Sequence, residues 1–150
     1  MRQTEELRYA ILALQREGNR ALATELKKLG VTPAQAEVIR VLDERAPLTL
    51  AGLGELLLCE TGTGPSRLVD RLVGSGLVLR SVDATDRRSV SLTLTPAGRA
   101  LSEHIALVEN GLYEVMDSLS AGHDVAPTLE LLRALLAPFP SGKALARRSA

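Results

Sequence analysis

Most hydrophobic positions of the chain recur every three or four residues, which is the spacing of one face of an α-helix. This pattern predicts a long first helix over residues 4–29. Its apolar positions are Leu7, Ile11, Leu14, Leu22, Leu26 and Leu29. Gly18-Asn19 interrupts the pattern and allows a kink, whereas Gly30 suits a C-terminal cap.

Capping residues and prolines then predict three shorter helices. Thr32 and Gln35 have the spacing of a capping box around Pro33, so a second helix begins there and ends at Ala46-Pro47. Thr49 caps a short apolar third helix, LAGLGELLLC, which we expect to end in its cysteine. The segment PSRLVDRLVGSG predicts the fourth helix, which starts with a proline and stops at two glycines.

The period of the pattern changes to two after the fourth helix. Residues 77–82 and 90–95 predict two strands of a hairpin, the second alternating as VSLTLT. Thr95-Pro96 then opens a fifth helix to about residue 119, and Asp124 caps a sixth, VAPTLELLRALLA, which Pro138 stops. We expect residues 140–150 to be a flexible basic tail.

The order of these elements is that of a winged helix-turn-helix flanked by long helices. The predicted fold class is therefore mainly α with one small β-hairpin. Within a single domain, 1–150, we place the DNA-binding part at residues 31–98 and the helical dimerisation part at residues 1–30 and 99–139. The fourth helix is the expected recognition helix.

Composition and charge refine this interpretation. The 150 residues are 45% hydrophobic and 24% charged, as in one globular domain. No apolar run reaches the ~20 residues that a membrane span needs, and Glu5 and Glu6 disfavour a secretory signal, so we expect a cytoplasmic protein.

The formal charge is zero, but residues 64–99 hold six arginines against three aspartates, while residues 100–139 hold six acids against one arginine. A basic segment of this kind favours a polyanionic partner.

Double-stranded DNA is the partner that the polar residues of this basic segment favour. A helix fits the major groove, where serine, threonine and arginine at its first turn read base edges, and arginines at a thin hairpin tip suit the minor groove. The expected DNA-binding residues are Thr63, Ser66, Arg67, Arg71, Arg87, Arg88 and Ser89. If Arg87 and Arg88 do not contact DNA, they would lie in a solvated turn at the hairpin tip. Arg71 is as well suited to a structural ion pair or a phosphate contact as to contact with a base.

Residues 66–101, SRLVDRLVGSGLVLRSVDATDRRSVSLTLTPAGRAL, resemble the MarR family of bacterial transcription factors. The motifs that carry this are the helix RLVDRL, the strand start GLV, the wing DATDRRS and the entry LTPAGRAL. The resemblance implies a homodimer on a pseudo-palindromic operator, acting as a repressor that a small molecule or an oxidant releases. It also implies that Arg88 enters the minor groove or pairs with Asp70, and that Asp86 braces the wing.

One departure from the family pattern concerns the start of the recognition helix. Aligned on RLVDRL, the chain has Thr61 at the usual cap but Pro65 four positions later, and proline has no N–H to bond back to the cap. We therefore expect the helix to start late, with Gly64 or Thr63 as its cap. Arg67 and Ser66 then remain the best candidates for base contacts.

The flanking helices would expose apolar faces in a monomer, which favours a dimer. The expected interface residues are Leu7, Ile11, Leu14, Leu112, Val115, Leu119, Leu132, Leu135 and Leu136. A winged-helix module that binds another protein instead of DNA is the alternative, since the last helices are acidic. An effector pocket that stacks on aromatic rings would have to use Tyr9, Tyr113 or Phe139.

The remaining candidates for chemistry have plainer interpretations. Cys59 is interpreted as a small buried hydrophobe, with a redox sensor as the alternative. His104 and His123 lack the spacing of metal ligands, and the glycine-rich TGTGPS lacks the ending of a phosphate-binding loop. We expect no metal, no cofactor and no catalytic residue.

Overall fold

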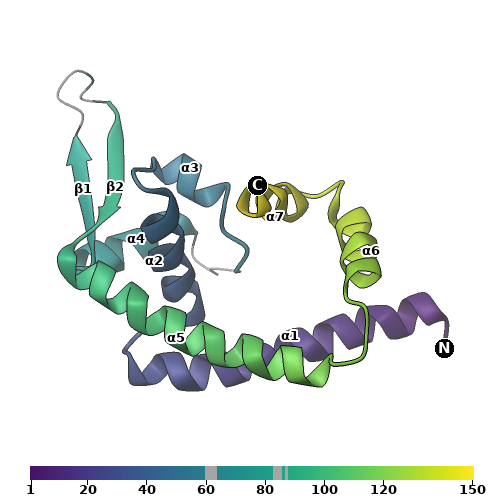
Figure 1. Cartoon of the computed structure of the whole chain (residues 1–150). Helices are drawn as coiled ribbons and strands as arrows, with labels where there is room; N and C mark the ends of the chain where they lie inside the picture. The colour runs from purple at the N-terminus through teal and green to yellow at the C-terminus, as the bar shows by residue number, and fades with distance from the viewer. Residues whose placement is uncertain (60–63, 83–85, 87) are drawn as a thin grey trace.

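The computed structural model describes residues 1–59, 64–82, 86 and 88–150 (Figure 1). Its elements in chain order are α1 (Gln3–Lys28), α2 (Pro33–Arg45), α3 (Leu50–Gly54), α4 (Pro65–Gly74), β1 (Val78–Val82), β2 (Val90–Leu94), α5 (Pro96–Leu119), α6 (Ala126–Leu136) and α7 (Pro140–Ser149). The predicted fold class, mainly helical with one antiparallel hairpin, is confirmed.

Three helix starts form as the sequence predicts. Thr32 Oγ1 accepts a hydrogen bond from Gln35 N at 3.2 Å, and Thr32 N donates to Gln35 Oε1 at 3.0 Å, which completes the capping box of α2. Thr49 and Thr95 cap α3 and α5 in the same way, each through its hydroxyl oxygen. These hydroxyls satisfy backbone donors that a helix end otherwise leaves unpaired.

The structure differs from the sequence predictions at two helices. α1 passes through Gly18-Asn19 without a break. α3 is shorter than expected: it ends at Gly54, so Cys59 lies in the segment after the helix. Gly52 and Gly54 weaken the short helix, and the next apolar position, Leu56, is buried in the core outside it.

The expectation of a flexible tail over residues 140–150 is wrong, because Pro140–Ser149 form α7. Pro140 occupies the first turn, where its missing N–H costs nothing, and Ala144 is buried. The polar partners of α7 lie about a hundred residues earlier, on α2 and at the C-cap of α3. A periodicity argument sees only local sequence and therefore misses them.

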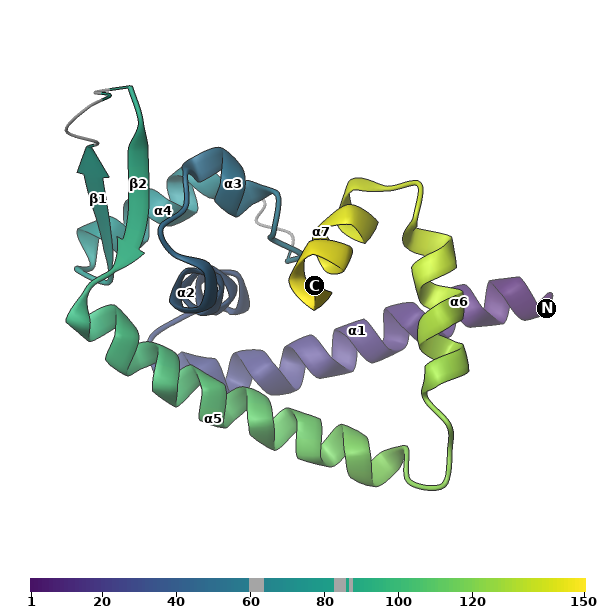
Figure 2. The same cartoon turned by 45° about the horizontal axis from the view of Figure 1, so that its top comes forward.

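The core surrounds α2, whose buried residues face α1, α4, α5 and β2 (Figures 1 and 2). The buried hydrophobic cluster consists of Leu26, Val31, Ala36, Val38, Ile39, Val41, Leu42, Leu53, Leu56, Leu68, Val69, Leu72, Val78, Leu92, Leu94 and Ile105. The two longest helices, α1 and α5, contact each other beneath this core, and α6 and α7 arch back towards α3. The hairpin projects from the opposite end.

The hairpin is joined to the helices at its base. β1 and β2 pair in register from Val78↔Leu94 to Val82↔Val90. Leu48, between α2 and α3, adds a bridge to Leu92, with N···O distances of 3.2 and 2.7 Å. These contacts fix the direction in which the wing leaves the core.

Candidate nucleic-acid interface

The recognition helix α4 starts late, as its sequence predicts. Gly64 is the N-cap, with φ of 82°, and Pro65 takes the first helical position. The positive φ favours glycine at this cap. Leu68, Val69 and Leu72 are buried, which turns the opposite face of the helix towards solvent.

The exposed face of α4 is polar and consists of Ser66, Arg67, Asp70 and Arg71. Their spacing of one and four residues places them along one side of the helix. The side chains of Ser66, Arg67 and Arg71 have no polar partner among the described residues, so they are available to an external ligand. This face has the dimensions and the donors that major-groove recognition requires.

Asp70 ties α4 to the wing through an ion pair with Arg80 of β1. The resemblance implied that Arg88 either enters the minor groove or pairs with this acid, and in the structure Asp70 pairs with Arg80. The reason is proximity, since β1 follows α4 directly and Arg80 is only ten residues from Asp70. Arg88 therefore takes no part in the ion pair between α4 and the wing.

The described part of the wing tip is organised by Asp86. Its Oδ1 accepts a hydrogen bond from Arg88 N at 3.0 Å, and its backbone oxygen accepts one from Ser89 N at 3.0 Å. This is an Asx-type turn, and it supports the expectation that Asp86 braces the wing. The Arg88 side chain is exposed, with no polar partner among residues 64–82, 86 and 88–150. Thr63 and Arg87 lie outside the described residues.

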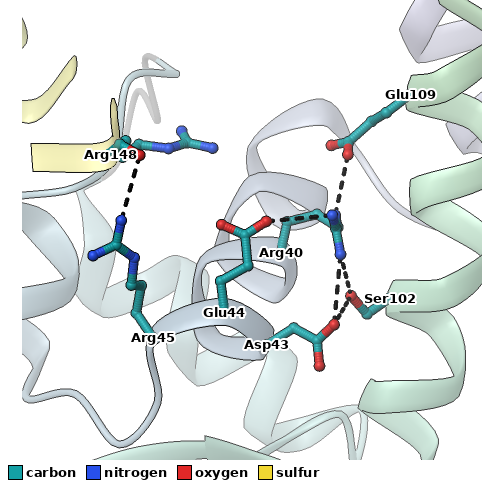
Figure 3. A network of polar contacts seen from close by, with 7 residues as sticks. All are labelled: Arg40, Asp43, Glu44, Arg45, Ser102, Glu109 and Arg148. Atoms are coloured by element: carbon teal, nitrogen blue, oxygen red, sulfur yellow. Dashed lines mark hydrogen bonds and ion pairs between the residues drawn. The ribbon is translucent and has the colours of Figure 1, made fainter. Parts of the chain in front are cut away.

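Behind the interface, a polar network that sequence reasoning missed joins α2 to α5 (Figure 3). Arg40 is at its centre: Nε donates to Glu109 at 3.1 Å and Nη1 to Ser102 Oγ at 3.1 Å. Nη2 lies 3.3 Å from Glu44, and Ser102 donates to Asp43 at 2.8 Å. An arginine between the buried Ile39 and Val41 was the available signal, but its partners on α5 were not visible in the sequence.

The residues expected at a dimer interface are at least partly exposed. Leu14 and Leu119 are 75% and 80% exposed, and Ile11, Val115 and Leu135 are also exposed. The more buried ones, which are only partly exposed, are Leu7, Leu112, Leu132 and Leu136. An apolar groove of about 490 Å³ runs between α1 and α5, lined by Leu22, Leu112 and Val115 among others.

Cys59 is half-buried, in line with its plainer interpretation. Burial, followed by the negative charge of Glu37, raises the pKa of this thiol from 9.0 to about 12. The thiolate is the reactive form, so the raised pKa makes Cys59 less reactive than a free cysteine.

His104 Nδ1 lies 2.8 Å from the Ala100 carbonyl oxygen on its own helix. Within the described ranges, no group of three or more potential metal ligands occurs.

The three aromatic residues lie on separate elements. Tyr9, Tyr113 and Phe139 are each about half exposed, at 51–55%, on α1, α5 and the turn before α7. No helix in the part of the chain that the structure describes is long and apolar enough to cross a membrane.

Comparison with known proteins gives a consistent result. A model of the MarR family matches residues 31–90. The organic hydroperoxide resistance transcriptional regulator of Bacillus subtilis is 31% identical over 103 residues, or 69% of each chain. The multiple antibiotic resistance protein MarR of Escherichia coli is 31% identical over 119 residues, which are 79% of this chain and 82% of that protein. A crystal structure of mutant Escherichia coli MarR complexed with operator DNA superimposes with a TM-score of 0.76 at 30% identity, covering 87% of this chain and 94% of that one.

Proposed function

The chain belongs to the MarR family of DNA-binding transcriptional regulators, and from this premise we propose that it is a homodimeric repressor that an effector releases from its operator. Its place of action would be the bacterial cytoplasm, where the chromosome lies. The homologues in the comparison are regulators and not enzymes, which agrees with the expectation that the chain has no catalytic residue.

The DNA-binding part of this proposal rests on the exposed polar face of α4, which the Asp70–Arg80 pair places beside the wing. On this surface Ser66, Arg67 and Arg71 would face the major groove, with Arg67 as the best reader of guanine. Arg88 would enter the adjacent minor groove, where the negative potential is concentrated. Ser89 and Arg87 are also proposed as phosphate or groove contacts.

A second copy of the chain would cover the exposed apolar face of α1, α5 and α6. Leu14 and Leu119 are the most exposed of the expected interface leucines, and apolar surface of this kind favours association. A twofold dimer would present its two α4 helices to successive major grooves, about 34 Å apart. The operator would then have matching half-sites.

Release would follow from a change in the angle between the winged part and the long helices. The Arg40 network is the polar joint between them, because it links α2 to α5.

A cavity of about 540 Å³, lined by Gln15, Asn19 and Cys59 among others, opens beside the segment that leads to α4. The raised pKa of Cys59 favours a small-molecule effector over an oxidant. If a ligand uses this cavity, Asn19→Trp will prevent it from releasing the DNA.

The test of DNA binding starts from duplexes that the wild-type protein selects from a randomised pool. Affinity should fall steeply as salt rises, and Arg88→Ala should lower both the affinity and the salt slope, the latter by about one. Lys27→Ala removes one exposed charge from the last turn of α1, which is not part of the proposed DNA-binding surface, and should change neither. If the protein selects no duplex but captures another protein, the alternative of a protein-binding winged helix is correct.

A further inference from the structure

Glu37 of α2 is a buried carboxylate in an unusual position, at the point where the chain leaves α3. The residue is 8% exposed. Oε1 accepts hydrogen bonds from Leu58 N at 2.7 Å and from Arg148 Nη1 at 2.6 Å, and Oε2 accepts one from Cys59 N at 2.7 Å. A carboxylate is costly to bury unless it is paired and hydrogen-bonded. Two backbone amides and one guanidinium supply that pairing here.

The two amides belong to the segment that leads into the recognition helix. Gly64, the N-cap of α4, follows Cys59 by five residues. Five residues span at most about 17 Å when fully extended, so anchoring residues 58–59 limits where α4 can begin. Apolar packing of Leu68 and Leu72 holds the other side of the helix in the core. Glu37 therefore supplies the polar anchor for the start of α4.

Arg148 brings α7 to this anchor from the other end of the chain (Figures 1 and 2). Arg45, at the end of α2, also holds the end of α7, since its Nη2 donates to the carbonyl oxygens of Arg147 and Arg148 at 3.3 and 3.4 Å. A cation at the C-terminal end of a helix is electrostatically favourable. Because α7 follows α6 after a short turn, the chain connects a proposed dimerisation helix to α7, and the polar contacts of α7 connect it to residues 58–59 through Glu37.

We propose that Glu37 and Arg148 are positioning residues for DNA recognition, so that α7 contributes to operator affinity without touching DNA. The pair holds the segment 58–59, and with it the start of α4, in the position that the operator requires. This inference rests on the proposed function. It adds a role for the last helix, which lies on the opposite side of α3 from the wing.

Arg147 provides a matched control on the same helix. It pairs with Glu55 at 3.3 Å, but both side chains are largely exposed, at 48% and 61%. Exposed ion pairs contribute little. In the Arg148–Glu37 pair the side chains are 29% and 8% exposed. Arg147→Gln and Arg148→Gln remove the same charge from adjacent positions, so a difference between them reports the contact with Glu37.

The experiment compares the full-length wild type with Arg148→Gln, Arg148→Lys and Arg147→Gln. One measurement is amide hydrogen exchange at Leu58 and Cys59, and the other is affinity for the selected duplex and for a scrambled duplex of equal length. Arg148→Gln should accelerate both exchange rates and weaken the selected duplex by about tenfold, the equivalent of one charge-assisted hydrogen bond. Affinity for the scrambled duplex should stay unchanged. Arg148→Lys should restore most of the loss, and Arg147→Gln should match the wild type.

The two measurements separate the failure of this inference from that of the proposed function. A wild-type protein that selects no duplex would refute the proposed function, while hydrogen exchange would still report the anchor. If Arg148→Gln behaves like Arg147→Gln in both measurements, the inference is wrong. It is also wrong if exchange accelerates while the affinity for the selected duplex stays the same, because Arg148 then has a structural role alone.

Discussion

Arg40 of α2 donates a hydrogen bond to Glu109 of α5 across 3.1 Å, although 69 positions separate them in the chain. The contact joins α2, in the part proposed to bind DNA, to the long helix α5 (Figure 3). Both side chains are 21% exposed, so solvent screens the pair less than it screens an ordinary surface pair. The same guanidinium reaches the fully buried Ser102, which makes Arg40 a joint between the two parts.

Arg40→Met should lower the free energy of unfolding by about 1–3 kcal/mol, because it removes charged hydrogen bonds and leaves Glu109 half-buried without its partner. Urea denaturation measures this change. Lys28→Met is the control, since Lys28 pairs with Glu25 on the surface at 2.9 Å and such pairs contribute about 0–1 kcal/mol. Equal losses in the two variants would show that the joint adds no stability.

Gly98 lies where the start of α5 packs closely against the base of the hairpin. A Cβ atom at this position would lie 2.1 Å from the Leu77 carbonyl oxygen, so Gly98→Ala should destabilise the fold by about 1–3 kcal/mol or more through overpacking. Gly74→Ala, in α4 with no atom within 4 Å of its Cβ position, should instead stabilise it by about 0.5 kcal/mol. Thermal melting distinguishes the two. A neutral Gly98→Ala would contradict the close contact between α5 and Leu77, the residue before β1.

The sequence predicts most of this fold because its signals are local. The capping box of Thr32 and Gln35 could be predicted from the sequence, and so could the late start of α4 at Pro65. Each depends on residues within one helical turn. The helical conformation of residues 140–149 could not be predicted from the local sequence. Arg148 is held by Glu37, 111 positions earlier, and no periodicity argument reaches that distance.

The candidate interface could be predicted by residue type but not by partner. The polar face of α4 and the arginines of the wing follow from the alternation of buried and exposed positions. Whether Asp70 meets Arg80 or Arg88 depends on how the strand leaves the helix, and this is a tertiary property. Arg40 was overlooked because a charge inside an apolar stretch has meaning only once Glu109 and Ser102 are placed beside it.

Cys59 should react slowly at neutral pH. With a pKa of about 12, about one thiol in ten thousand is ionised at pH 8, so alkylation by iodoacetamide should be far slower than that of a free cysteine. The rate should rise with pH up to about 12, and the stabilisation from the neutral thiol should be lost between pH 9 and 12. The urea-unfolded chain, which should react at the ordinary rate, is the control. Rapid alkylation of the folded protein at pH 8 would revive the redox-sensor interpretation.

The Asx-type turn at Asp86 should matter for DNA binding more than for stability. Asp86→Ala removes the acceptor for Arg88 N, so ordering the wing on DNA should cost about 0.5–1.5 kcal/mol, a loss of affinity of about twofold to twelvefold. Asp86→Asn removes the same charge but keeps the acceptor, and it should bind at least as tightly as the wild type. Affinities for the selected duplex provide the comparison. If the Ala and Asn variants bind equally, Asp86 does not brace the wing.

The central claim is that two copies of the chain, joined through their exposed apolar helices, bind one DNA duplex. Sedimentation of the protein with its selected duplex measures this most directly. We predict two chains of 16.0 kDa per duplex. Leu119→Arg, at a site 80% exposed within one chain, should sediment as a folded monomer that binds the duplex at least about a hundredfold more weakly. One wild-type chain per duplex, or full affinity in a monomeric Leu119→Arg, would contradict the account.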